Sequence, residues 1–153
     1  MRGASSERGC LIIQNGKTVA KTVANWFTFD ICKQRPCRVP AEIGNCYPIH
    51  DFEDLFFNYK KPDIPENAEF AYEITVRNKD IDTNMHLNNQ KSAEMLMDAL
   101  PFDYCFTKMN VFYKNPAFLG DKLGVYITSG ENGYFVQLKN SDGEICVAGE
   151  FTE

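Results

Sequence analysis

The sequence has little of what several common function classes require. Its only histidines are His50 and His86, and none of its six cysteines forms a CxxC pair or lies at zinc-finger spacing from a histidine. A net charge of −5 disfavours a nucleic-acid-binding surface. No apolar run approaches the ~18 residues that a membrane-spanning helix needs. We therefore expect no metal site, no nucleic-acid partner and no membrane span.

The first ten residues, MRGASSERGC, are polar and lack the apolar run of a signal peptide. Together with the cysteine spacing, this predicts a cytoplasmic protein whose thiols are free. Hydrophobic residues make up 44% of the 153 residues, and aromatic residues 13%. That composition is sufficient for the core of one folded domain.

The first part of the chain predicts a β-hairpin over residues 10–30. Its turn is Asn15-Gly16, a pair that tolerates the positive φ angles of a tight hairpin turn. Residues 31–68 are interrupted by prolines and are typical of a connector, with a short helix predicted at 51–58.

Residues 69–153 predict a strand, a helix and then four more strands. Strict alternation of apolar and polar residues predicts a half-buried strand over 69–77. Apolar residues at helical spacing follow, with Asn88 or Asn89 as the N-cap and Pro101 as the stop.

Four antiparallel strands are then expected. The first, over 105–113, places Cys105 on the face that points to the core. Residues 10–26 resemble 136–151, since both read as strand, turn ending in Gly, then strand. This similarity indicates that the chain opens with the closing hairpin of a related unit.

The stretch KDIDTNMHLNNQ, residues 79–90, lies between the predicted strand and helix. Asp82, Asn84 and His86 recur at every second position, so an extended segment places them on one side. A helix start carries unpaired N–H groups that can bind a developing oxyanion. The residue types alone leave two interpretations open: catalytic groups, or turn and capping residues. Asp80 reads as a solvated carboxylate.

The letters DIDTNMHLNN fit the block D-x-D-x-N-x-H-x-N-N and closely resemble the acyl-acyl-carrier-protein thioesterases of the plant-type and bacterial family. The segment GKTVAKTVANWFTFDICKQRPCRVPAEI is similar to that family's G, A and W followed by R-P-x-R-x-P-x-E-I. The resemblance extends from about residue 8 to the end of the chain.

This resemblance implies an α+β fold of the hotdog type, an antiparallel sheet wrapped around one long helix. The family has two hotdogs in tandem. Residues 69–153 are then the catalytic hotdog, residues 8–45 the β-hairpin remnant of the first one, and residues 46–68 a linker. The resemblance thus implies an N-terminally shortened chain. Because hotdogs commonly pair, a homo-oligomer is expected.

The resemblance also implies hydrolysis of the fatty acyl thioester of acyl carrier protein, which releases a free fatty acid and ends chain elongation. Asp82 would be the nucleophile or general base, and Asn84 would hold the water or the carboxylate. His86 would orient the water or move a proton. N–H groups near Asn88 and Asn89 would stabilise the oxyanion. No cofactor is expected.

The sequence departs from the family at one functional position. In FYKNPAFLGD the family's glutamate falls on Pro116 and its adjacent cysteine on Ala117. Two alternatives therefore stay open, a non-catalytic hotdog that binds acyl chains or dimerises, and an acyl-coenzyme A thioesterase. An acidic carrier protein needs a basic contact surface, for which the candidates are Lys33, Arg35, Arg38, Lys60 and Lys61.

Overall fold

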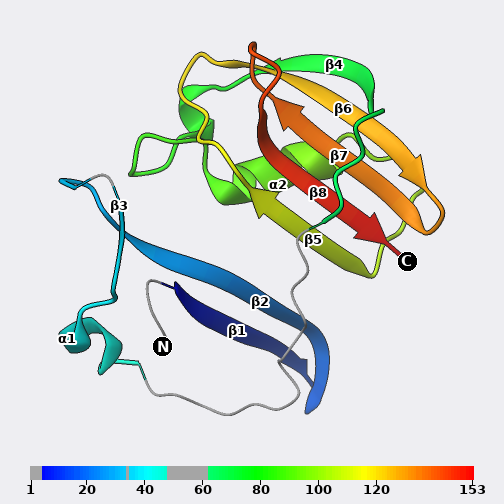
Figure 1. Cartoon of the computed structure of the whole chain (residues 1–153). Helices are drawn as coiled ribbons and strands as arrows, with labels where there is room; N and C mark the ends of the chain where they lie inside the picture. Colours follow the sequence, from blue (N-terminus) through cyan, green and yellow to red (C-terminus); the bar gives the residue numbers. More distant parts are fainter. Residues whose placement is uncertain (1–4, 34, 48–61) are drawn as a thin grey trace. The chain divides into compact units, whose positions relative to one another are not determined.

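The computed structural model describes residues 5–33, 35–47 and 62–153. The chain forms two compact units, Met1–Tyr59 and Lys60–Glu153 (Figure 1). The predicted helix at 51–58, His50 and two of the candidate lysines (Lys60 and Lys61) lie outside the described residues.

The first unit is built on a long antiparallel hairpin. Its turn residues Asn15 and Gly16 have φ angles of 52° and 75°, which confirms the predicted hairpin turn. A short third strand pairs with the end of the second. The elements are β1 (Ser5–Gln14), β2 (Lys17–Asp30), β3 (Arg35–Cys37) and α1 (Ala41–Gly44).

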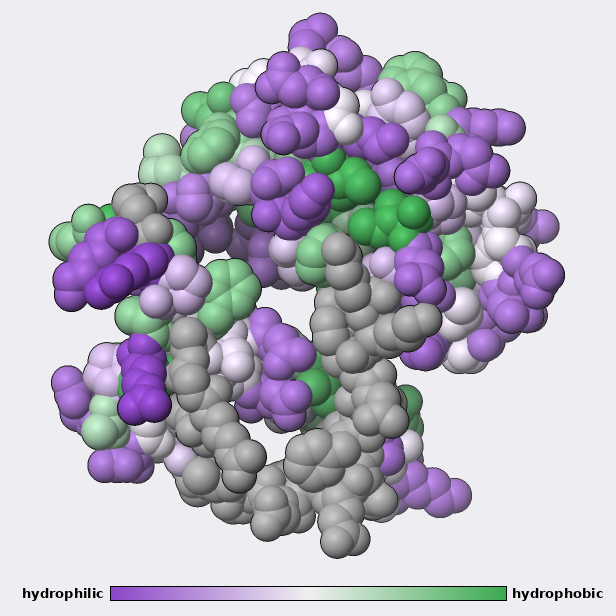
Figure 2. All heavy atoms as spheres, in the orientation of Figure 1, coloured by the Kyte–Doolittle hydropathy of each residue, from purple (hydrophilic) through white to green (hydrophobic). Residues whose placement is uncertain are grey.

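The hairpin leaves large apolar side chains at the surface. Figure 2 shows hydrophobic residues among hydrophilic ones on the visible face of the molecule. Within this unit the exposed hydrophobic residues of β1 and β2 are Ile12, Ile13, Val19, Trp26, Phe27 and Phe29. Trp26 and Phe27 are adjacent in β2 and so point to opposite faces of the hairpin. Apolar side chains are therefore exposed on both of its faces.

The second unit is a five-stranded antiparallel sheet with one helix on one of its faces (Figure 1). The strand order is β4-β6-β7-β8-β5, and α2 packs against the central strands β7 and β8. The element order of strand, helix and four strands is the one that the sequence predicts. The predicted four-stranded meander is wrong, because only β6, β7 and β8 follow one another in the sheet, while β5 pairs with β8 at the edge. The elements are β4 (Glu69–Thr75), η2 (Asn78–Asp80), α2 (Asn89–Met97), β5 (Lys108–Tyr113), β6 (Lys122–Gly130), β7 (Gly133–Lys139) and β8 (Ile145–Thr152).

The core of this unit lies between α2 and the sheet. Leu96 of α2 and Phe151 of β8 are both fully buried. A Cβ atom at Gly149 would lie 3.0 Å from Leu96 Cδ1 and 2.9 Å from the Phe151 ring. Glycine at this position therefore lets the helix approach the sheet closely. The other fully buried apolar strand residues of this core are Leu123, Val125, Val136, Leu138 and Cys146.

Three details of the sequence prediction differ in the structure. Strand β4 ends at Thr75, and its Phe70 and Tyr72 are exposed, so the half-buried strand predicted over 69–77 is wrong in its end and its burial. Helix α2 ends at Met97, one turn before Pro101, so the proline does not itself end the helix. Strand β5 begins at Lys108, and Cys105 lies before it and is exposed, so the core position predicted for Cys105 is wrong. The reason is that Phe106 packs against Phe151, with ring centroids 5.1 Å apart, and occupies the core in place of the cysteine.

Within the described residues, no helix is both long and apolar enough to cross a membrane. The same residues contain no group of three or more His, Cys, Asp or Glu side chains that could hold a metal ion.

The contrast between Cys105 and Cys146 gives a direct test of this fold. Cys146 is buried, and burial raises the pKa of its thiol, so little reactive thiolate forms there. We expect a disulfide-exchange reagent at pH 8 to label Cys105 in the folded protein and Cys146 only after unfolding. Mass spectrometry of the labelled peptides measures both, with Cys105→Ser as the control. Equal labelling of both thiols without denaturant would contradict this packing.

Candidate active site

The polar stretch between β4 and α2 forms a tight loop, not the extended segment that the sequence predicts. Ile81 and Leu87 form an antiparallel bridge at its base. Inside it, the Asp82 N–H donates to the His86 carbonyl at 2.9 Å, and the Met85 N–H donates to the Asp82 carbonyl at 3.1 Å. Met85 has a φ of 63°, a left-handed conformation that reverses the chain. The expected alternation of three side chains on one side is therefore wrong.

The Asp82 carboxylate is the reason for this turn. Its Oδ1 accepts hydrogen bonds from the backbone N–H groups of Asn84, at 2.8 Å, and His86, at 3.2 Å. Short acidic side chains stabilise turns in this way, in competition with extended structure. Within the described residues no hydrogen bond reaches the other oxygen, Oδ2. Asp82 thus holds the loop with one oxygen and keeps the second available.

The three residues predicted to act together have different surroundings. Asp82 and His86 are both half-buried and are joined through the His86 N–H. The His86 imidazole meets the ring of Phe118 edge-on, with centroids 5.1 Å apart. Asn84 is exposed, and in the described part of the chain its side chain makes no hydrogen bond to either partner. The Asp82 carboxylate therefore binds the backbone of both Asn84 and His86, and Asn84 is the more exposed of these two residues.

Asp80 is not the solvated carboxylate that the sequence predicts, since only 4% of it is exposed. Its Oδ2 accepts the Arg77 N–H at 2.9 Å and so closes the short helix η2. Its backbone carbonyl accepts the Asn88 N–H at 2.8 Å. Asp80 is buried because it binds residues before and after the loop, Arg77 and Asn88. Residue type and spacing do not predict these two contacts.

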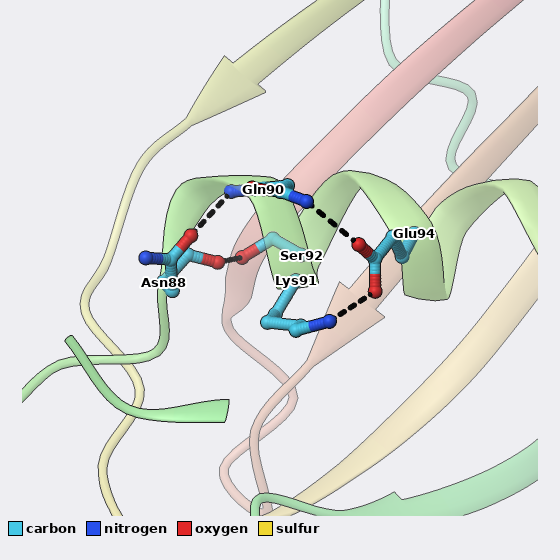
Figure 3. Close-up of polar contacts among 5 residues, drawn as sticks. All are labelled: Asn88, Gln90, Lys91, Ser92 and Glu94. Carbon is cyan, nitrogen blue, oxygen red and sulfur yellow. Dashed lines mark hydrogen bonds and ion pairs between the residues drawn. The ribbon is translucent and has the colours of Figure 1, made fainter. Parts of the chain in front are cut away.

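The N-cap of α2 is Asn88, one of the two residues predicted for this position (Figure 3). The Asn88 Oδ1 accepts the Gln90 N–H at 2.8 Å, and the Asn88 carbonyl accepts both the N–H and the hydroxyl of Ser92. Among the described residues no acceptor contacts the N–H groups of Asn89 and Lys91. These two donors lie at the positive end of the helix dipole, where an oxyanion is stabilised.

The basic side chain in this first turn is already paired. Glu94 accepts hydrogen bonds from Lys91 Nζ at 2.6 Å and Gln90 Nε2 at 3.0 Å (Figure 3). The Lys91 hydrogen bond, and then the Gln90 one, lowers the pKa of Glu94, and Glu94 in turn raises the pKa of Lys91. The Lys91 ammonium is thus directed along the helix toward Glu94, and the helix start offers backbone donors.

A second segment, distant in sequence, lies beside the loop. The Ala117 carbonyl accepts the Leu87 N–H at 2.8 Å, and the Phe118 ring contacts His86. Further back, the Tyr113 hydroxyl donates to the Asn89 carbonyl at 3.1 Å. Residues 113–118 therefore run antiparallel to residues 86–89.

This second segment supplies no carboxylate to the loop. Pro116 stands at the position where the family resemblance places glutamate, and Ala117 is buried. The neighbouring Asn115 turns toward β8, because its side-chain amide donates to the Ile145 carbonyl at 2.9 Å.

Tyr113 and Phe118 are site neighbours that the sequence analysis does not name. Tyr113 falls in the strand predicted over 105–113, and no comparable pattern marks Phe118.

Residues 64–149 match the family described as acyl-ACP thioesterase C-terminal domain. The chain belongs to this family. The match includes the polar loop, all of α2 and the segment 113–118. The comparison with curated proteins gives no match.

Solved structures of acyl-ACP thioesterases share the fold. An acyl-ACP thioesterase from Bacteroides thetaiotaomicron is 18% identical, with a TM-score of 0.78, and the match covers 99% of this chain and 64% of that one. A protein assigned as an oleoyl thioesterase from Lactobacillus plantarum is also 18% identical, with a TM-score of 0.74, covering 97% of this chain and 62% of that one.

These likenesses confirm the α+β hotdog fold. At such low identity they concern the fold alone. The chain spans less than two thirds of the length of either structure.

Proposed function

We propose that the protein hydrolyses the thioester that joins a fatty acyl chain to acyl carrier protein. The products would be a free fatty acid and the carrier's free thiol, and chain elongation would end. The observation that carries this proposal is the loop of Asp82 and His86 placed directly before the start of α2, in a member of the acyl-ACP thioesterase family. No metal or cofactor takes part in the proposed reaction.

The chemistry requires few groups. A thioester carbonyl is electrophilic, and its thiolate leaves with little need of protonation at neutral pH. In our proposal the free Oδ2 of Asp82 attacks the carbonyl or activates a water, and His86 orients that water or transfers a proton. The exposed carboxamide of Asn84 holds the water. The N–H groups at the start of α2, near Asn88 and Asn89, receive the oxyanion.

Carrier-protein binding is proposed for the basic residues of the first unit. Arg35 and Arg38 are exposed, and neither forms an ion pair within the described residues. Lys33 is less available, because its Nζ lies 3.5 Å from Asp30 Oδ2. Arginine pairs well with the phosphate and carboxylate groups of an acidic partner. We also propose, from the resemblance, that the protein forms a homo-oligomer.

The test is a substrate comparison with the purified full chain. Thiol release is measured from acyl-carrier-protein and acyl-coenzyme A thioesters that bear the same acyl groups. We expect a higher kcat/KM for the carrier-protein esters. We also expect thiol release to be about 10²- to 10⁴-fold slower with His86→Ala.

Other outcomes separate the alternatives. A higher kcat/KM for coenzyme A esters would overturn the carrier-protein assignment and favour an acyl-coenzyme A thioesterase. Blank-level rates for both the native chain and His86→Ala would overturn hydrolysis. Binding of a fluorescent fatty acid in that case would favour the non-catalytic hotdog.

A further inference from the structure

The first turn of α2 has one anchor that comes from a distant strand. Tyr113, the last residue of the edge strand β5, donates its hydroxyl to the backbone carbonyl of Asn89, the first residue of the helix. We propose that Tyr113 is a positioning residue that fixes the helix start and so aims its N–H groups at the reacting carbonyl. This inference rests on the proposed function of the same site.

The helix itself does not supply this bond. In an α-helix the Asn89 carbonyl accepts the N–H of Ala93, which uses one of its two lone pairs. The Tyr113 hydroxyl uses the other and ties the helix to the sheet. The other hydrogen bonds of this turn are local, from the Asn88 cap and from Gln90 and Lys91 to Glu94. The Asn88 N–H bond to the Asp80 carbonyl is the exception.

The later part of α2 is held against the sheet by its buried side chains. Ser92 and Leu96 are the buried residues of the helix, and both come after its first three residues. Asn89 is exposed and contributes no core contact. Without the Tyr113 bond, the first turn keeps its cap but loses its direct link to the sheet edge.

Tyr113 is also suited to remain a donor. Partial burial raises the pKa of its hydroxyl above the ordinary value of a tyrosine. The phenol therefore keeps its proton through the neutral and mildly alkaline range. Removal of this proton is not needed for the positioning role, since the hydroxyl only donates.

The chain offers a matched control for the test. Tyr104 also donates its hydroxyl to a backbone carbonyl, that of Phe151, at 3.1 Å. It lies outside the loop and α2. The variants Tyr113→Phe and Tyr104→Phe therefore each lose one bond of the same kind and length.

We expect Tyr113→Phe to lower kcat by about tenfold with KM within about twofold, because displaced oxyanion donors act on the transition state. Tyr104→Phe leaves kcat within about twofold. Amide hydrogen exchange at Ser92 and Ala93 becomes faster in Tyr113→Phe and stays unchanged in Tyr104→Phe.

The two readouts separate the proposals. With an active native chain, equal kcat values for the two variants, or unchanged exchange at Ser92 and Ala93, would overturn the role of Tyr113 and leave hydrolysis intact. An inactive native chain overturns the proposed function instead. In that case amide hydrogen exchange tests only whether Tyr113 holds the helix start. Faster exchange in Tyr113→Phe supports this role, and unchanged exchange overturns it.

Discussion

Replacing His86 with alanine is expected to lower kcat for thioester hydrolysis by about 10²- to 10⁴-fold, the usual range for loss of a general acid or base. The loop should keep its shape, because its bonds to Asp82 use the backbone of His86 and not the imidazole. The ring contact with Phe118 is the packing that the variant loses. Initial rates on an acyl-carrier-protein thioester, with thermal unfolding measured beside them, test this.

Met85→Ala is the control for this experiment. Met85 is the neighbour of His86 in the same loop, and 66% of it is exposed. We expect its kcat to stay within about twofold of the native value, because the side chain is exposed and alanine keeps a Cβ atom at this left-handed position. If His86→Ala kept half of the native rate, the catalytic assignment of His86 would be wrong.

Truncation of Leu96 to alanine is expected to lower the free energy of unfolding by about 2–5 kcal/mol. Leu96 is fully buried between α2 and β8, and its Cδ1 approaches Gly149 so closely that the site cannot collapse without moving the helix. The lost contacts and the cavity left behind both contribute. Urea denaturation followed by fluorescence measures the change, with the slope m expected to stay constant.

Met97→Ala is the matched control in the same helix. Met97 is the next residue, and 37% of it is exposed. The packing it loses is smaller, so we expect a loss below about 1 kcal/mol. Similar losses at the two positions would mean that α2 does not present Leu96 to the core.

Much of the fold could be predicted from local chemistry. The Asn15-Gly16 turn and the Asn88 cap follow from residue preferences that act over a few residues. The succession of strand, helix and four strands follows from periodicity, but the place of β5 beside β8 does not. The family follows from a motif with its fixed letters in place.

The parts that could not be predicted depend on contacts between distant segments. Periodicity places Asp82 and His86 on one side of an extended chain, yet the Asp82 carboxylate binds the backbone and bends it into a loop. Cys105 alternates with core residues, but Phe106 takes the core contact. The Tyr113 hydroxyl donates to the Asn89 carbonyl, 24 residues away in the sequence, and no local spacing pattern predicts such a contact.

Several statements remain predictions. They are the division into a remnant at 8–45, a linker at 46–68 and a catalytic hotdog at 69–153, the homo-oligomer and the cytoplasmic location.

The strand order β4-β6-β7-β8-β5 has a consequence for how the protein folds. The loop follows β4 at one margin of the sheet, and Tyr113 ends β5 at the opposite margin. Both margins must be in place before residues 86–89 meet residues 113–118. Such non-local contacts form late, since chain closure over long separations is slow. A refolding chain should therefore regain helix and sheet signals before it regains hydrolysis.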